Sequence, residues 1–294
     1  MIAHTDEHRN NFVNITNIKK MSSQLPRSTA HFVRSNAKVC VHTLLSPGPM
    51  FANATHIIEL SDQLILIDGH FFAQYGQEFR ELADSLKKPI SRFYVTHDHP
   101  DHYLGMGDSF RDVIVYALPE IKASIVKSGP VELEEKRQKM GDLIASQLVV
   151  PTKSVEPGEE LISGVKFIFE RVLDTESPST LVIKLPELGM LIAQDILYHN
   201  THAFITGPVD NWKKALLQIR EDKEYDLILP GHGQPAQKAD IDNAINYLEK
   251  AFSIFSTTNC PEQYKHELLN AYPSYAADRL IDIYSPILFG KKSH

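Results

Sequence analysis

The chain has 294 residues, enough for one large domain or two small ones with a substantial buried core. A hydrophobic content of 43% and a charged content of 23% are those of an ordinary globular protein. The net charge of −7, without a basic stripe along the chain, argues against a nucleic-acid partner. No apolar run approaches the roughly 18 residues of a membrane-spanning helix, so no membrane partner is expected either.

The N-terminus and the cysteines bear on the compartment. Residues 1–12, MIAHTDEHRNNF, are polar and acidic, whereas a signal peptide is basic and then apolar. Cys40 and Cys260 offer neither a disulfide framework nor a cysteine-based zinc site. The expected compartment is therefore the cytoplasm.

Strand and helix signals alternate through the first half of the chain after a polar start. Residues 1–36 lack sustained periodicity and are expected to form a partly ordered N-terminal arm. The apolar runs THIIEL and QLILIDG flank Ser61–Asp62, which predicts a hairpin. QEFRELADSLKK has helical spacing and ends just before Pro89. ISRFYVT and DVIVYAL predict strands, and residues 131–147 predict a long polar helix.

The second half continues the alternation and then becomes helical. Strands are predicted for VKFIFERV, STLVIKLP, GMLIAQD and YDLILPG, with a helix at NWKKALLQIRED. The alternation indicates an α/β class. Residues 239–294 predict a C-terminal helical extension packed on the same domain, with a lid or a homodimer surface as the alternative roles.

The stretch THDHPDH, residues 96–102, has the spacing of a metal site. His97 and His99 alternate along an extended segment, so both imidazoles can face one ion if the chain turns at Pro100. Asp101 and His102 follow that turn and can face a second ion. Imidazole nitrogen and carboxylate oxygen bind Zn²⁺ at about 2.0–2.2 Å, and iron and manganese accept the same ligands.

Two more candidate ligands lie at the ends of predicted strands. Asp195 comes directly after LIAQ, and His232 follows LILPG. Ligands of open α/β sheets bind at the carboxyl edge of the strands. We therefore expect both side chains to lie near the histidine cluster.

The motif HDHPDH resembles the H-x-H-x-D-H signature of the metallo-β-lactamase superfamily. LILIDG is similar to the strand that ends in the family's buried aspartate, here Asp68. MLIAQDILY is similar to the segment whose aspartate bridges two metals, here Asp195, and LPGHG to the strand end that supplies the last histidine, here His232. The four motifs stand in the family's order between about residues 38 and 236.

This resemblance implies a fold and a cofactor. The fold is an αββα sandwich of two mixed β-sheets with outer helices, occupying residues 37–238, with the metal site at one sheet edge. The cofactor is two divalent ions, expected to be Zn²⁺, with iron or manganese as alternatives. Asp68 is expected to support the metal loop through hydrogen bonds rather than bind an ion.

One position departs from the family pattern. Members usually carry a further histidine in a G-H-[ST]-P-G-[ST] stretch, and TESPST aligns with it here, which places Glu176 in the histidine position. Glu176 is predicted to bind the first ion with His97 and His99, a His₂Glu set that suits catalytic zinc. Two alternatives remain: Glu176 acts behind the ligands or on the substrate, or the site is degenerate and holds one ion or none.

The resemblance and the ligand set predict a metal-dependent hydrolase of a small molecule. Metal-bound hydroxide, formed because bound metal lowers the pKa of water to roughly 7, would attack an ester, lactone, thioester or amide. Asp101 is the predicted catalytic residue, because it lies where it can orient the nucleophile and move its proton. Tyr103 and His202 are predicted substrate contacts, against packing roles for both.

Two other functional classes stay open at this point. An iron-dependent oxidoreductase, similar to the sulfur dioxygenases of the same fold, is the main alternative, since a carboxylate-rich site tolerates iron. A non-catalytic metal-binding protein is the second. All the other ligand positions are retained, which favours an enzyme.

Overall fold

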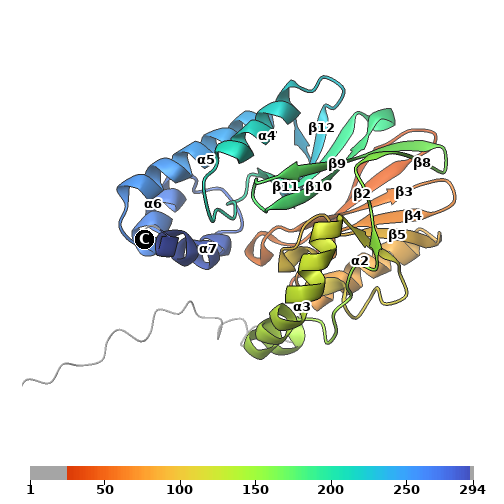
Figure 1. Cartoon of the computed structure of the whole chain (residues 1–294), viewed down its shortest axis with the longest axis horizontal. Helices are drawn as coiled ribbons and strands as arrows, with labels where there is room; N and C mark the ends of the chain where they lie inside the picture. Colours follow the sequence, from red (N-terminus) through yellow and green to blue (C-terminus); the bar gives the residue numbers. More distant parts are fainter. Residues whose placement is uncertain (1–24, 292–294) are drawn as a thin grey trace, which may run out of the picture.

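Two mixed β-sheets pack face to face with helices on their outer sides (Figure 1). The computed structural model describes residues 25–291. The first sheet follows the chain in strand order β1 to β7, and the second has the order β13-β12-β11-β10-β9-β8. In the first, β4 to β7 are parallel to one another, and in the second only β11 and β12 are parallel. This architecture confirms the predicted α/β class and sandwich.

The strands of the first sheet are β1 (Thr29–Ser35), β2 (Cys40–Leu45), β3 (Ala54–Glu59), β4 (Leu64–Ile67), β5 (Ile90–Tyr94), β6 (Val115–Ala117) and β7 (Lys153–Ser154). Those of the second sheet are β8 (Gly158–Ile162), β9 (Val165–Leu173), β10 (Ser179–Leu185), β11 (Met190–His199), β12 (Leu227–Gly233) and β13 (Ala236–Gln237). The helices are α2 (Ala73–Ser85), α3 (Pro119–Met140), α4 (Asp210–Glu221), α5 (Asp240–Thr257), α6 (Pro261–Ala271) and α7 (Arg279–Gly290). Short 3₁₀ turns are η1 (Gly48–Met50), η2 (Pro100–His102), η3 (Leu104–Met106), η4 (Gly141–Leu143) and η5 (Pro186–Leu188).

The central strands are buried on both faces, which explains why their sequences are continuously apolar. Every residue of β4 and of β12 is buried, as are all but the last of β11. Strands covered on both sides read as apolar runs rather than as an alternating pattern. The predicted hairpin is also present, because β3 and β4 are antiparallel and Glu59 pairs with Leu64 across the turn.

The N-terminal boundary differs from the predicted arm. β1 is a sheet strand that pairs with β2, and the segment before it is tied to α2. The Leu25 amide donates to Gln74 Oε1 at 2.7 Å, and the Ser28 amide donates to Glu78 Oε2 at 2.8 Å. Residues 1–24 of the predicted arm lie outside the described residues.

The predicted long helix is shifted toward the N-terminus. α3 begins at Pro119, where the ring pre-sets a helical φ, and ends before Gly141, whose φ is +63°. An interior proline usually breaks a helix. The structure continues the helix through Pro130.

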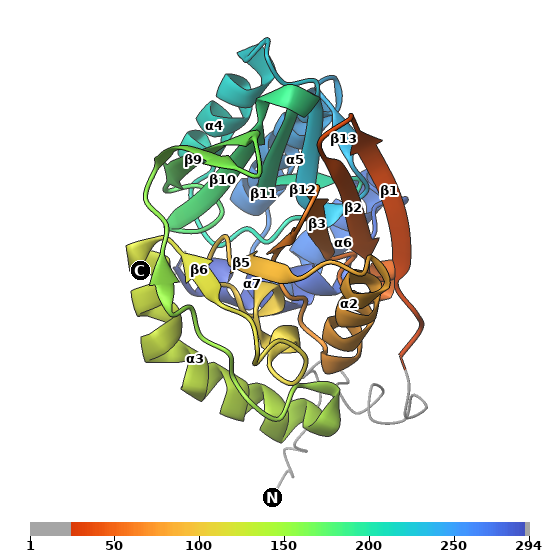
Figure 2. The same ribbon diagram turned by 90° about the vertical axis from the view of Figure 1, so that its right-hand side faces the viewer.

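Three C-terminal helices lie together at one end of the sandwich beside α4 (Figure 1), and they lie behind the strands in the turned view (Figure 2). Their buried apolar side chains, among them Ile241, Leu248, Leu268 and Ile281, belong to the same core as those of the two sheets. The helical character predicted for this region is confirmed. Within residues 25–291, no helix is long and apolar enough to cross a membrane.

Candidate metal centre

The seven predicted ligands come together from both sheets at one edge of the sandwich. His97 and His99 follow β5, and η2 carries Asp101 and His102. The second sheet supplies the remaining three: Glu176 from the β9–β10 turn, Asp195 from β11 and His232 from β12. Their ligand atoms form two groups, and within each group all atoms lie within 4.8 Å of one another. A third such group joins Asp68 to His97 and His102 and so overlaps both.

The first group consists of His97, His99, Glu176 and Asp195. His99 Nδ1 lies 3.0 Å from Glu176 Oε1, and His97 Nε2 lies 3.9 Å from Glu176 Oε2. His97 Nε2 is also 3.6 Å from Asp195 Oδ2. The carboxylate of Glu176 therefore faces both histidines, in the position predicted for the family's third-motif ligand.

The second group consists of Asp101, His102 and His232. Asp101 Oδ2 lies 3.2 Å from His232 Nε2 and 3.6 Å from His102 Nε2. Asp195 also faces this group, with Oδ1 3.2 Å from His102 Nε2 and Oδ2 3.3 Å from His232 Nε2. Asp195 thus lies between the two groups, as a bridging ligand must.

These atoms fit divalent ions better than they fit one another. Nε2 of His97, His102 and His232, both oxygens of Glu176 and Oδ1 of Asp195 are buried without a hydrogen-bond partner. Leaving buried polar atoms unsatisfied is costly, so natural proteins rarely do it. Donors bonded at about 2.0–2.1 Å to a tetrahedral ion lie about 3.3 Å apart, which matches the separations between these ligand atoms.

Hydrogen bonds behind the histidines fix which nitrogen faces the centre. A carboxylate only accepts, so His102 Nδ1 must donate to Asp68 Oδ2 at 3.0 Å. Asp68 also accepts from the amide and the hydroxyl of Thr96, which places it between strand end and metal loop. His232 Nδ1 donates to the Phe51 carbonyl at 2.7 Å. In both histidines the Nε2 lone pair is therefore left facing the ligand groups.

The pKa values of the ligand residues are shifted by their close pairing in a buried site, as expected where cations bind. Burial lowers the pKa of His232, but Asp195 and Asp101 together outweigh burial and raise it to about 10. Burial likewise lowers the pKa of His99, and Glu176 reverses this and raises it to about 9. Burial raises the pKa of the Asp195 carboxyl, yet His102 and its neighbours hold it well below its usual range. Metal binding would replace the protons that these histidines carry.

Only two of the seven side chains reach solvent appreciably. The side chain of His99 is 24% exposed and that of Asp101 is 20% exposed, whereas the other five are at most 1% exposed. The open side of the centre is therefore next to His99 and Asp101. Asn53 lies at that side and its Nδ2 approaches Asp101 Oδ2 at 3.4 Å.

Several contributors to the centre were not predicted. The Tyr198 hydroxyl donates to Asp195 Oδ2 at 2.6 Å, and its ring stacks on His232 with centroids 4.7 Å apart. Regular strand alternation would put Tyr198 and Asp195 on opposite faces. The register of β11 against β12 shifts between Gln194 and Tyr198, and Gln194 has a φ of +47°, which brings them together. Asn53 and the Phe51 carbonyl come from the loop between β2 and β3.

The structure does not support the two predicted substrate contacts. Tyr103 and His202 belong to none of the ligand groups, and both are completely buried. His202 Nδ1 pairs with the Tyr247 hydroxyl of α5 at 3.0 Å, and burial lowers its pKa to about 4. Neither side chain offers surface to a substrate, so the structure favours packing roles for both.

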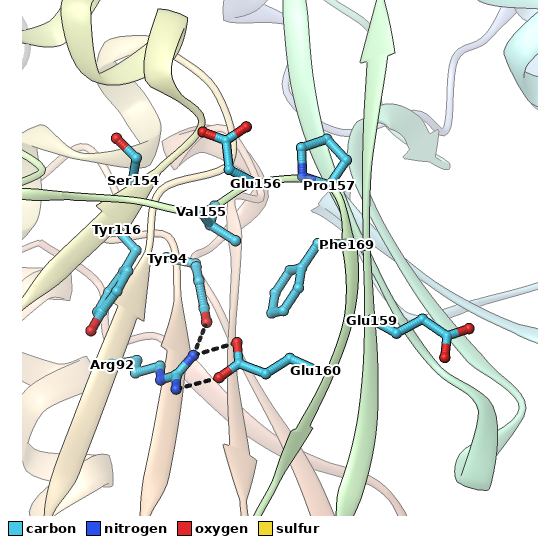
Figure 3. A pocket seen from close by; sticks show the side chains of 11 residues that line it. Arg92, Tyr94, Tyr116, Ser154, Val155, Glu156, Pro157, Glu159, Glu160 and Phe169 are labelled. Carbon is cyan, nitrogen blue, oxygen red and sulfur yellow. Dashed lines mark hydrogen bonds and ion pairs between the residues drawn. The ribbon is translucent and has the colours of Figure 1, made fainter.

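A separate surface cavity of about 400 Å³ lies at the seam between the sheets (Figure 3). Arg92 donates two hydrogen bonds to Glu160 there and one to the Tyr94 hydroxyl. None of the seven ligand residues lines this cavity. It is therefore distinct from the metal centre.

Comparison with known proteins agrees with the fold. The model of the metallo-beta-lactamase superfamily matches residues 47–232. The chain belongs to the metallo-β-lactamase superfamily, as its motifs predict.

Two curated relatives carry sulfatase names. An alkyl/aryl-sulfatase of Saccharomyces cerevisiae is 24% identical over 221 residues, and a linear primary-alkylsulfatase of a Pseudomonas species is 27% identical over 222 residues. Each alignment covers 61% of this chain but only 34% and 41% of the respective relative. The chain therefore spans less than half of the length of these relatives.

Solved structures share the fold at low sequence identity. A metallo-beta-lactamase from Pontibacter korlensis is 18% identical, with 75% of this chain and 99% of that chain covered. The mono-zinc form of a Pseudomonas aeruginosa metallo-beta-lactamase is 20% identical, with 77% and 98% covered. A stereoselective inverting sec-alkylsulfatase from Pseudomonas is 17% identical, with 81% and 45% covered. All three have a TM-score of 0.57.

Proposed function

We propose that this protein is a metal-dependent hydrolase that binds two zinc ions and cleaves an ester, lactone, thioester or amide of a small molecule. The observation that carries the proposal is the set of buried, unpartnered histidine and carboxylate atoms at ligand-to-ligand spacing. Such a set is costly without cations and is open to solvent on one side. Family membership supports the same reading.

Each ion has a distinct set of ligands in this proposal. His97, His99 and Glu176 would hold the first, in the His₂Glu pattern of catalytic zinc sites. Asp101, His102 and His232 would hold the second, and Asp195 would contact both. When bound, the ions supply an acidified water and a Lewis acid for the oxygen of the scissile group.

The chain's own residues orient this chemistry. Asp68 and the Phe51 carbonyl hold His102 and His232 in the tautomer that leaves Nε2 free. Asp101 is the partly exposed carboxylate of the set, so it is placed to accept a proton from the attacking water and pass it outward. Asn53 limits the orientations that Asp101 can adopt.

An alkyl sulfate ester is the second candidate substrate. The observation that favours it is the name of both curated relatives, which align with 61% of this chain. A sulfate ester, like a carboxylic ester, is cleaved by water, so the same residues would serve either substrate. An activity measurement with both substrate classes is therefore needed to distinguish them.

The test begins with metal analysis of the full chain purified without chelator. We expect two equivalents of zinc and turnover of at least one class in a panel of carboxylic esters, lactones, thioesters, amides and alkyl sulfates. A Glu176→His variant then shows whether the carboxylate tunes the rate or only fills a ligand position. One equivalent of iron with oxygen uptake would replace this proposal with the redox class. A protein that retains no metal would overturn both.

A further inference from the structure

An aromatic side chain stands beside the most exposed ligand of the centre. The Phe204 ring packs edge-on against the His99 imidazole, with centroids 5.4 Å apart and planes at 68°. Phe204 is partly buried and comes from the loop between β11 and α4, downstream of Asp195 on the same segment. It therefore lies at the open side of the metal centre.

The C-terminal helices hold this ring in place from behind. Tyr284 of α7 packs edge-on against Phe204, with centroids 5.8 Å apart. Tyr284 is itself completely buried, and its hydroxyl lies 2.9 Å from the Tyr264 hydroxyl of α6. The position of Phe204 is therefore set by side chains that are buried in the C-terminal helices.

The loop on both sides of Phe204 is tied to the same helices. The His202 amide donates a hydrogen bond to the Ala276 carbonyl at 2.8 Å, and the His202 ring forms a hydrogen bond with the Tyr247 hydroxyl. On the other side, Lys291 Nζ donates to the Thr206 carbonyl at 2.8 Å. A loop fixed at both ends presents its aromatic ring in one place, which limits the entropy lost when a ligand packs against it.

We propose that Phe204 is the apolar wall of the substrate site beside His99, and that it selects substrates whose group on that side is an alkyl or aryl chain. This rests on the proposed hydrolase function. Each methylene that packs against the ring should raise kcat/KM by about fourfold, which corresponds to about 0.8 kcal/mol. The C-terminal helices are then part of the specificity machinery through Tyr284.

The experiment compares 4-nitrophenyl acetate, butyrate, hexanoate and octanoate, which share one leaving group. The proteins are the wild type, Phe204→Ala, Phe204→Leu and, as a matched control, Phe252→Ala, which removes a 43% exposed ring from α5. Zinc content is measured for each. In the wild type, kcat/KM should rise with chain length.

In Phe204→Ala the rise should disappear, with a loss of about tenfold or more on octanoate and less than about threefold on acetate. Zinc content should match the wild type, Phe204→Leu should keep most of the rise, and Phe252→Ala should behave as the wild type. If kcat/KM still rises with chain length in Phe204→Ala as it does in the wild type, the proposal that Phe204 forms the apolar wall is overturned. A lower zinc content with an equal loss on all four esters also overturns it, because Phe204 would then position His99 instead.

Failure of the proposed function gives a different result. If the zinc-loaded wild type cleaves none of the four esters nor the other substrates of the panel, the hydrolase proposal fails. The role of Phe204 is then tested by calorimetry, which measures the affinity of the protein for acetate, butyrate, hexanoate and octanoate. Affinity that rises with chain length in the wild type and not in Phe204→Ala supports it, and equal slopes overturn it.

Discussion

Glu176 gives the first ligand group a negative charge at a position where the family usually has a neutral histidine. Its side chain is fully buried, and neither oxygen has a hydrogen-bond partner among residues 25–291. An added anionic ligand lowers the effective charge of the ion and so its power to acidify water. It also makes the group more tolerant of iron and manganese.

The Glu176→Gln variant tests this ligand directly, because it keeps the shape and removes the charge. We expect one equivalent of tightly bound zinc instead of two. The affinity of the first group should fall by more than about 100-fold, since even partners behind ligands cost about 10–100-fold. Calorimetric titration of the metal-free protein measures both. Glu221→Gln, an exposed position on α4, is the control, and two wild-type equivalents in Glu176→Gln would contradict the assignment.

The Tyr198→Phe variant tests the unpredicted partner of Asp195. It keeps the ring stack on His232 and removes only the hydroxyl that donates to Asp195 Oδ2. Zinc affinity should fall by about tenfold, while the melting temperature of the metal-free protein changes little. Wild-type affinity in this variant would show that the hydrogen bond does not orient Asp195.

The candidate ligands could be predicted from sequence because most of them lie in recognisable motifs at or near the end of a strand. Tyr198 could not, since its approach to Asp195 depends on an irregularity in β11 that no pattern of residues reports. His202 was misplaced for a related reason. A histidine in a loop after a ligand strand looks available to substrate, and only the helices that pack on that loop bury it.

Among the elements, the parallel pair β11 and β12 forms the floor of the centre. A Cβ built on Gly231 would come within 1.8 Å of Asp195 Oδ1, so glycine is required for the two strands to approach this closely. Gly231, the first glycine of the LPGHG motif, is thus required for steric reasons. It leaves room for the carboxylate that faces both ligand groups.

Gly231→Ala should therefore displace Asp195 and weaken both ligand groups. We expect a loss of about 1–3 kcal/mol in the free energy of unfolding, as for other overpacked sites, together with a lower zinc content. Urea unfolding and metal analysis measure the two effects. Gly207→Ala is the matched control, because a Cβ there meets nothing within 4 Å. Equal behaviour of the two variants would remove the steric argument.

An ion-paired carboxylate at the end of β3 predicts a pH-dependent contribution to stability. Burial raises the pKa of Glu59, but Lys88 and His42, each at 2.9 Å, outweigh it and lower the pKa below 4.5. A depressed pKa stabilises the fold above the unfolded value, and the contribution is lost as pH falls through the folded value. Glu59→Gln should thus cost about 1 kcal/mol at pH 7.

The difference between Glu59→Gln and the wild type should shrink as the pH falls below the unfolded pKa of about 4.3, and it should vanish below the lower folded pKa, where Glu59 is protonated in the folded and the unfolded protein. Urea unfolding at several pH values measures it. Glu156→Gln, at an exposed position, corrects for the change in net charge. A difference that is constant with pH would assign the effect to shape rather than charge.

The helices and strands could be predicted where the hydrophobic periodicity is strong. They were less predictable where that periodicity is weak or where a proline lies inside a helix. The central strands and α4 lie where their apolar runs predict. The long helix was predicted for residues 131–147, whereas α3 spans Pro119–Met140. Its N-terminal half buries Ile121 and Ile125, and this packing outweighs the cost of the interior Pro130. β1 was missed because it is an edge strand of mostly exposed residues, so no alternation marks it.

At the scale of the whole molecule, the metal centre joins the two sheets. His97 to His102 follow a strand of the first sheet, whereas Glu176, Asp195 and His232 belong to the second. Ions bound here would link the halves of the sandwich in the folded state only. Binding of this kind stabilises a protein by about 4 kcal/mol when the free ion is at a thousandfold its Kd.

Chelation should therefore lower the melting temperature by about 10 °C in a chain of this size. Differential scanning calorimetry with and without chelator measures it, and added zinc should restore the value. The Glu176→Gln variant should show a smaller shift than the wild type. No shift in the wild type would mean that the sheets are held without the ions.

Because His99 and Asp101 are the exposed members of the set, bound ions and a substrate would, under the proposed function, share one route to solvent. Whatever occupies that route also delays the departure of the metal behind it. Under the proposed function, substrate or product in the site would therefore slow the loss of metal. Turnover and metal retention become linked properties of a single opening.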